Sequence, residues 1–146
     1  MHLLLNYFSE CSNYVTLNEA TRNSQHVTST LYCDSLSQTS RGNWVGTGWY
    51  RFEGDAGVQL SEYPICRDRC GTHGAGWLNG VHPTQTDTAE QRQVCFNLQT
   101  SGNSCSNARN IMVRNCGSYY VYQLQDLGGC WYRYCGSNPG MDFSME

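Results

Sequence analysis

The chain has 146 residues and a formal net charge of −3, from nine arginines, no lysine and twelve acidic residues. That length suits a single domain, and the small, dispersed charge excludes a strongly basic surface of the kind that binds nucleic acid or an anionic membrane. Ten tyrosines, four tryptophans and fifteen glycines favour short strands joined by tight turns, and no stretch approaches the ~20 apolar residues of a membrane span.

The first half of the chain is predicted to be mostly loops around one strand. Asn23 to Thr30 and Ser35 to Ser40 are rich in Ser, Thr, Asn and Gln, which is typical of loops. Leu17 to Arg22 can form one helical turn. Trp49 to Glu53 predicts a strand, which the turn from Gly54 to Gly57 closes.

The strongest local pattern is a β-hairpin late in the chain. Residues alternate in character from Ile111 to Asn115, a connection containing Gly117 follows, and Tyr119 to Leu124 forms the second arm. Because this arm begins with aromatic residues on both faces, we expect it inside a sheet and not at an edge. Val94 to Leu98 predicts a strand before the hairpin, and Trp131 to Tyr134 predicts a short one after it.

Nothing of helical period and length accompanies these strands. The sequence therefore predicts an all-β (β-dominated) fold, a small disulfide-rich extracellular module with a C-terminal β-hairpin.

Nine cysteines spread along the whole chain predict a disulfide framework. Zinc sites gather their ligands as C-x2-C pairs, whereas the closest pairs here are Cys66/Cys70 and Cys130/Cys135. His73 lies near Cys70, but no second cluster completes a metal site. We expect no metal and no cofactor, and we expect an extracellular location, secreted or at the cell surface. The alternative is a cytosolic protein with nine reduced thiols.

An ordered series of motifs gives this framework a family likeness. It comprises Cys11-x-x-Tyr14-x-x-Leu17, Cys33-Asp34, Gly48-Trp49-Tyr50-Arg51-Phe52, Cys70-Gly71-Thr72, Trp77-Leu78-Asn79-Gly80, Arg92-Gln93-Val94-Cys95, Ile111-Met112-Val113-Arg114-Asn115-Cys116 and Cys130-x-x-Arg133-Tyr134-Cys135-Gly136. The series resembles the cysteine-rich domain shared by uromodulin, the pancreatic secretory granule membrane glycoprotein 2 and the liver-specific zona pellucida protein. The resemblance implies a non-enzymatic extracellular module over residues 11–136, with neighbouring domains in a longer chain.

The flanking segments are expected to lie outside this module. The apolar start, Met1 to Leu5, is too short for a signal peptide, so residues 1–10 are expected to be the beginning of a fragment. Residues 137–146 are expected to be a tail or linker.

The resemblance also implies a set of disulfides. Three are Cys11–Cys116, Cys33–Cys130 and Cys70–Cys135. The fourth is Cys95–Cys105, with Cys66 as the odd cysteine, or Cys66–Cys105, with Cys95 as the odd cysteine. The odd thiol is either buried and inert or bonded to a partner chain.

One property of the family does not transfer. Relatives can carry an N-glycan that bacterial adhesins bind, in the stretch that matches Trp77 to Pro83. The corresponding Asn79-Gly80-Val81 is not an N-x-S/T sequon, and the chain contains none.

The same stretch nevertheless supplies the candidate binding residues. Sugar rings stack on exposed aromatic side chains, and several glycines surround Trp77 in a segment predicted to be a loop. We expect Trp77, Asn79 and His82 to form the binding surface; the alternative for Trp77 is that it fills a small core.

Catalysis is not indicated. A cysteine nucleophile needs a histidine base, and Cys70 with His73 would be lost to the expected disulfide. Glu53 and Asp55 flank a turn, where such side chains serve the backbone. The sequence thus predicts a binding module for an extracellular protein or glycan, with a purely structural spacer as the alternative.

Overall fold

The computed structural model describes residues 9–100 and 104–140 and confirms a β-dominated fold with almost no helix. The elements are β1 (Val15–Leu17), η1 (Ala20–Arg22), β2 (Gly48–Phe52), η2 (Gly54–Ala56), β3 (Gln59–Leu60), β4 (Gly74–Leu78), β5 (Glu90–Asn97), β6 (Asn107–Asn115), β7 (Tyr120–Leu124), β8 (Tyr132–Tyr134) and β9 (Gly136–Ser137). Both η elements are single 3-10 turns. In the part of the chain described, no helix is long and apolar enough to cross a membrane.

The expected flanking segments fall mostly outside this part of the chain. Of residues 1–10 only the last two are described, and of residues 137–146 only the first four. Strand β9 includes Ser137, one residue past the expected end of the module.

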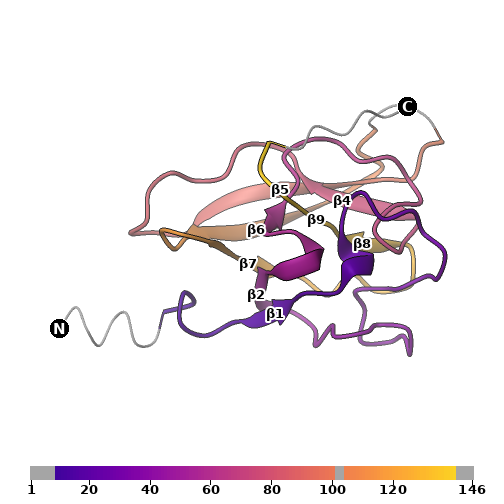
Figure 1. Ribbon diagram of the computed structural model, residues 1–146, viewed down its shortest axis with the longest axis horizontal. Helices are drawn as coiled ribbons and strands as arrows, with labels where there is room; N and C mark the ends of the chain where they lie inside the picture. Colours follow the sequence, from indigo (N-terminus) through magenta and orange to yellow (C-terminus); the bar gives the residue numbers. More distant parts are fainter. Residues whose placement is uncertain (1–8, 101–103, 141–146) are drawn as a thin grey trace.

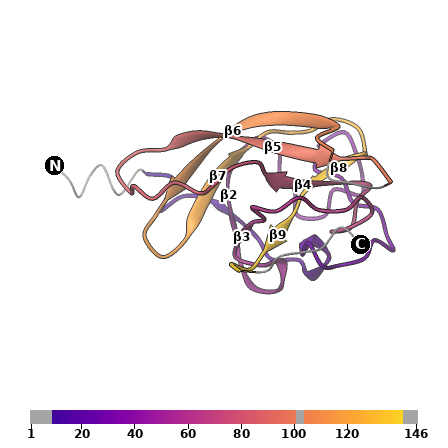
Figure 2. The same ribbon diagram turned by 90° about the horizontal axis from the view of Figure 1, so that it is seen from above.

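Seven strands form one curled sheet in the order β1-β2-β7-β6-β5-β4-β8 (Figure 1). Neighbours are antiparallel except at the two edges, where β1 runs parallel to β2 and β8 runs parallel to β4. The remaining strands, β3 and β9, form a separate antiparallel ribbon. Figure 2 shows the long strands β5 and β6 side by side. The sheet thus joins segments from both ends of the chain.

The predicted hairpin is confirmed as β6 and β7. Its turn is closed by the Cys116 backbone N–H, which donates to the Tyr119 carbonyl at 2.8 Å. The inward residues Ile111 and Val113 are buried, as the period-2 alternation predicts. β7 lies between β2 and β6, so the aromatic second arm is inside the sheet, as expected.

The segment around Trp77, predicted to be a loop, is the strand β4. Every residue of β4 is buried, so the polar–apolar alternation that reveals a half-buried strand is missing. Its glycines allow close packing: a Cβ atom at Gly76 would lie 2.6 Å from the Phe96 ring, and one at Gly74 would lie 2.5 Å from the Tyr132 ring.

Other predicted boundaries also differ, most of them by one residue; β6 begins four residues before Ile111. β5 ends before Leu98 and begins at Glu90, well before Val94. Its first half was missed because all four of its residues are polar and show no alternation. The helical turn predicted from Leu17 shortens to η1, since Leu17 itself ends β1.

The sheet separates two buried clusters of unequal size. The larger one packs on one face and includes Leu17, Trp44, Tyr50, Phe52, Leu60, Leu78, Val94, Phe96, Ile111, Val113, Tyr122, Leu124 and Tyr134. The smaller one contains Ile65, Cys70, Ala75, Trp77, Cys95 and Cys135. Because Ala75 and Trp77 alternate with Gly76 and Leu78 along β4, the two clusters lie on opposite faces.

Four disulfides fasten the loops to this sheet. They are Cys11–Cys116, Cys33–Cys130, Cys70–Cys135 and Cys95–Cys105, the pairs that the family resemblance implies. Of the two alternatives for the fourth bond, the structure contains the one with Cys95. The ninth cysteine is Cys66, which is half-buried.

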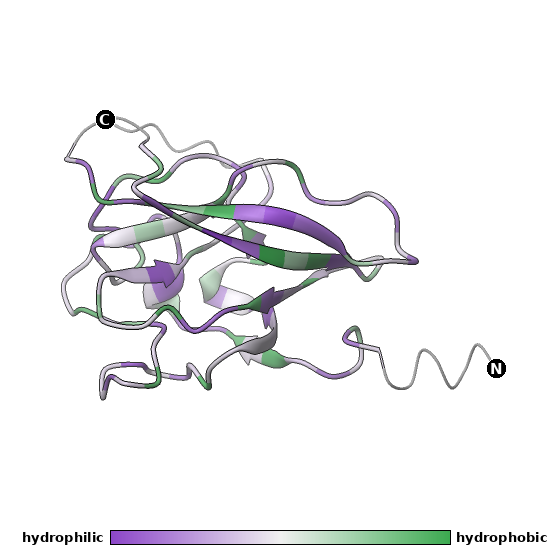
Figure 3. Cartoon of the chain, turned by 180° about the vertical axis from the view of Figure 1, so that it is seen from behind, coloured by the Kyte–Doolittle hydropathy of each residue, from purple (hydrophilic) through white to green (hydrophobic). Residues whose placement is uncertain are grey.

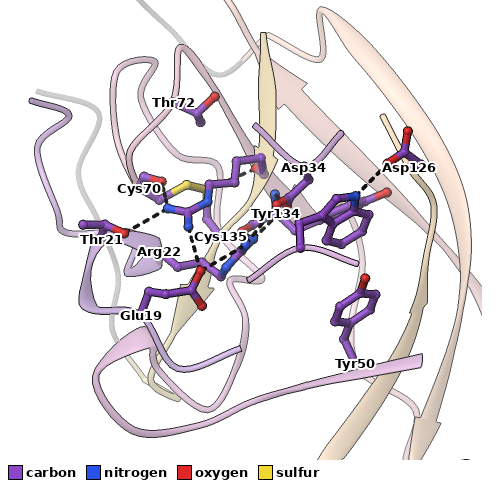
Figure 4. A network of polar contacts seen from close by, with 12 residues as sticks. Glu19, Thr21, Arg22, Asp34, Tyr50, Cys70, Thr72, Asp126, Tyr134 and Cys135 are labelled. Atoms are coloured by element: carbon purple, nitrogen blue, oxygen red, sulfur yellow. Dashed lines mark hydrogen bonds and ion pairs between the residues drawn. A yellow bond between two sulfur atoms is a disulfide. The ribbon is translucent and has the colours of Figure 1, made fainter. Parts of the chain in front are cut away.

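A buried ionic network ties the N-terminal loops to β8 (Figure 4). Both terminal nitrogens of Arg22 donate to the Asp34 carboxylate, at 2.7 and 2.9 Å, and the Tyr134 backbone N–H donates to the same carboxylate at 3.0 Å. Arg133 donates to Glu19 at 3.0 Å. Burial and the nearby Arg22 charge lower the pKa of Arg133 to about 10, so the guanidinium stays protonated at neutral pH.

Candidate functional site

Uncharged amide side chains form a row across the strands on the face of the sheet opposite the larger cluster, which we call the outer face. Gln93 of β5 pairs with Asn110 of β6. On one side Asn79 donates its backbone N–H to the Gln93 carbonyl at 2.8 Å and its side-chain amide to Gln93 Oε1 at 2.9 Å. On the other side the Gln125 side-chain amide donates to the backbone carbonyl of Asn110. Register partners point to the same face, and the hydrogen bonds of Asn79 and Gln125 place these two residues beside the pair. The four amides therefore stand side by side.

A second row runs parallel to the first. Trp49 of β2 pairs with Gln123 of β7, Gln123 pairs with Met112 of β6, and Met112 pairs with Gln91 of β5. Gln91 lies two residues before Gln93, so both rows occupy the same face. We call the residues of the two rows the amide face: Trp49, Asn79, Gln91, Gln93, Asn110, Met112, Gln123 and Gln125.

The amide face follows from the alternation along the strands. Between its residues stand Val94, Ile111 and Leu124, which are buried in the larger cluster on the opposite side. A half-buried strand needs apolar residues only on its inner face, and here the outer positions hold amides. Figure 3 shows both hydrophobic and hydrophilic residues along the long strands.

Part of this surface is a groove. It has a volume of about 460 Å³ and is lined by Thr47, Gln91, Asn110, Ile111, Met112, Gln123, Gln125 and Asp126. Most of the amide face is exposed; Trp49, Met112 and Gln125 are half-buried. The amide groups are therefore accessible to a ligand.

Hydrogen bonds to neighbouring residues fix Gln125 and Asp126 at the rim of the groove. Asp126 Oδ1 accepts hydrogen bonds from Trp44 Nε1–H at 2.7 Å and from the Leu36 backbone N–H at 2.8 Å. The Gln125 N–H donates to the Tyr134 hydroxyl at 3.1 Å, and that hydroxyl donates back to the Gln125 carbonyl at 2.9 Å. Burial raises the pKa of Tyr134, so its hydroxyl keeps the proton that it donates.

The chemistry of this surface is neutral and rich in hydrogen-bonding groups. Each side-chain amide carries two N–H donors and one carbonyl acceptor. Within residues 9–100 and 104–140, the side-chain amides of Gln91, Asn110 and Gln123 form no hydrogen bond to protein. Trp49 and Met112 add apolar surface between them. The arrangement suits a ligand with many hydroxyl groups, no charge and one apolar side.

The structure places two of the expected binding residues very differently. Trp77 has only 3% of its surface exposed and packs in the smaller cluster with Ile65 and Cys95. The core alternative describes its position, and no ring surface is left for stacking on a sugar. Asn79 is exposed and belongs to the amide face.

His82, the third expected residue, is buried in a chain of hydrogen bonds. Its Nδ1 lies 2.6 Å from Glu62 Oε2, and its Nε2 lies 2.7 Å from the Tyr122 hydroxyl. That hydroxyl also accepts the Leu60 backbone N–H at 3.0 Å. Every group is satisfied if neutral His82 donates from Nδ1 and accepts the Tyr122 proton at Nε2. His82 therefore fastens its loop to β7 and faces the protein interior.

Sequence reasoning missed the amide face because its members come from separate segments. A signal was present: Gln91 and Gln93, and again Gln123 and Gln125, stand two residues apart in β-prone stretches. Two such pairs predict polar outward positions. Only the strand order and register bring them together.

Comparisons with known proteins agree on one family. A family model described as a uromodulin-like domain matches residues 50–136. The pancreatic secretory granule membrane major glycoprotein GP2 of Rattus norvegicus is 35% identical over 132 residues, covering 88% of this chain and 23% of the relative. The Homo sapiens GP2 is 35% identical over 129 residues, with 88% and 22% covered. Uromodulin of Rattus norvegicus is 33% identical over 137 residues, with 93% and 19% covered. The chain thus spans less than a quarter of the length of these relatives.

Proposed function

The chain belongs to the uromodulin-like domain family, an extracellular, disulfide-rich module, and we propose that it is a non-enzymatic binding module whose amide face recognises a neutral glycan. One relative, GP2, is named as the major glycoprotein of the pancreatic secretory granule membrane, and another is uromodulin. The binding of a glycan by this chain is our proposal.

The observation that supports this proposal is the pair of aligned rows on the outer face. A sugar hydroxyl both donates and accepts a hydrogen bond, and a side-chain amide offers both complements in one plane. The sheet fixes the backbone positions of the six amide residues before a ligand arrives, which lowers the entropy cost of binding. Half-buried Trp49 and Met112 can contact the C–H side of a sugar ring.

The charge distribution favours a neutral ligand. None of the eight residues of the amide face is ionisable, and the carboxylate of Asp126 at the groove rim is the nearest charge among its lining residues. Asp126 already accepts two hydrogen bonds from the protein. A strongly anionic ligand would meet no counter-charge in the groove.

Side-chain amide signals in an NMR spectrum test this proposal directly. We expect neutral oligosaccharides, titrated into the isotope-labelled chain, to shift the amide signals of Gln91, Asn110 and Gln123. The signal of the exposed Gln85, which lies outside the amide face, should not move. The proposal fails if no neutral oligosaccharide shifts these signals at millimolar concentration, or if the shifts map to another surface.

The alternative is a spacer that positions neighbouring domains. Four disulfides and a buried ionic network give the stiffness that such a role needs. A spacer would bind no oligosaccharide reproducibly, so the same titration separates the two functions.

A further inference from the structure

One highly exposed tryptophan, Trp131, lies outside the amide face. Trp131 is 60% exposed, whereas Trp44 is 1% and Trp77 is 3% exposed. Its ring is exposed although its backbone is fixed: the Trp131 carbonyl accepts the Gly74 N–H at 2.7 Å, and the preceding Cys130 is bonded to Cys33. An exposed aromatic ring on a fixed backbone loses little conformational entropy when it binds a ligand.

A polar pair stands beside this ring. The centroids of the His73 and Trp131 rings are 5.8 Å apart. His73 Nδ1 lies 3.0 Å from Asp68 Oδ1, and Arg67 Nε donates to Asp68 Oδ2 at 3.1 Å. The Asp68 side chain is 51% exposed, so its carboxylate remains accessible to a ligand.

The loop that carries this pair has an uncommon backbone. Asp68 has φ +64° and Cys70 has φ +50°, in the left-handed region that residues other than glycine rarely adopt. The loop is closed by the Asp68 N–H, which donates to the His73 carbonyl at 2.8 Å, and by the Cys70–Cys135 disulfide. This fixed turn holds Asp68 and His73 next to the exposed ring, and strained loops of this kind often carry function.

We propose that Trp131, His73 and Asp68 form a second carbohydrate subsite, which takes one neutral hexose unit of a glycan. The C–H side of the sugar stacks on Trp131, while its hydroxyls bond to the His73 ring and the Asp68 carboxylate. A cationic ligand fits less well, because Arg67 already neutralises Asp68 at close range. The proposal rests on the proposed function for the class of ligand, but its residues are separate from the amide face. Two sites would make the chain bivalent for a branched glycan.

Because each proposed site contains one tryptophan, the fluorescence of that tryptophan can report ligand binding at each site separately. Trp44 and Trp77 are buried, Trp49 belongs to the amide face, and Trp131 belongs to the second site. In the variant Trp49→Phe, ligand-dependent fluorescence reports Trp131; in Trp131→Phe it reports Trp49. The probes are methyl glycosides of neutral hexoses and neutral oligosaccharides, with acrylamide quenching as the measure of ring exposure.

We expect a sugar to protect Trp131 from acrylamide in Trp49→Phe. Trp131→Ala should weaken binding at the second site about tenfold, and His73→Ala should weaken it in the same direction. Trp131→Phe, which keeps a stacking ring, is the matched control and should retain most of the affinity. Because Trp131 is exposed, its replacement should leave the unfolding temperature unchanged, which separates lost binding from lost folding.

The two proposals fail in different ways. If Trp49 responds to sugars and Trp131 does not, the second site is overturned and the proposed function stands. If Trp131 responds and Trp49 does not, the second site is supported and the amide face is contradicted. If neither ring responds to any probe at millimolar concentration, both proposals are overturned.

Discussion

At the scale of single residues, His82 and Asp34 show how buried polar groups hold loops against the sheet. His82, in the loop after β4, contacts Glu62 through Nδ1 and Tyr122 of β7 through Nε2. Asp34 accepts two bonds from Arg22 and one from the Tyr134 backbone. Each group is acceptable in the core only because its partners are present.

The His82 hydrogen-bond chain makes stability depend on pH. Burial lowers the pKa of His82 from 6.5, although Glu62 acts in the opposite direction. The unfolded chain then takes up a proton before the folded one does, so this stability is complete above pH 6.5 and is lost as the pH falls through the lowered pKa. We expect the free energy of unfolding, measured with urea, to decrease as the pH falls below 6.5. His82→Gln should remove part of that decrease; an unchanged pH profile would contradict the assignment.

Removing one charge of the buried Arg22–Asp34 ion pair is expected to lower the stability of the fold strongly. Asp34→Asn removes the carboxylate that accepts both Arg22 hydrogen bonds and leaves only the more distant Glu19, at 3.6 Å, as a counter-charge, and we expect a loss of about 3–5 kcal/mol in unfolding free energy. The matched control is Glu90→Gln, because the Glu90–Arg92 pair is 3.6 Å apart and partly exposed. That variant should change stability by less than about 1 kcal/mol. Equal effects of the two variants in urea titrations would contradict the structural role of the network.

At the scale of the elements, the hairpin β6–β7 could be predicted from sequence and β4 could not. The hairpin has one buried and one exposed face, so Ile111 and Val113 stand out by alternation. β4 is buried on both faces and contains two glycines, which normally indicate a loop. The amide face lay between these extremes: the outward polarity of Gln91 and Gln93 was readable, but its register with Asn110 and Gln123 depends on tertiary pairing.

The packing of β4 gives a prediction about glycine. Gly76→Ala would place a methyl group 2.6 Å from the Phe96 ring, and we expect a loss of about 1–3 kcal/mol from overpacking. Gly48→Ala in β2 is the matched control, since no atom lies within 4 Å of its added Cβ. Thermal unfolding should separate the two variants clearly. A neutral Gly76→Ala would show that β4 does not pack closely against Phe96.

At the scale of the whole molecule, long-range bonds hold an open set of loops on one sheet. Three disulfides join cysteines 105, 97 and 65 residues apart, and each such bond typically adds about 2–4 kcal/mol by limiting the unfolded chain. The cysteine pattern made this framework readable from sequence through the family resemblance. The buried positions of Trp77 and His82 were not readable, because the burial of a single side chain depends on which loops cover it.

The proposal that the amide face binds a neutral glycan can be tested by replacing its exposed amides without disturbing the sheet beneath them. The measurement is the affinity for a neutral oligosaccharide that shifts the amide signals, determined by calorimetry. It is made on three proteins: the unchanged chain, the double variant Gln91→Ala/Gln123→Ala and the control Gln85→Ala. All three positions are exposed, so stability should change by no more than about 0.5 kcal/mol per substitution. We predict that the double variant binds about tenfold more weakly and that Gln85→Ala binds normally. An unchanged affinity in the double variant would contradict the account.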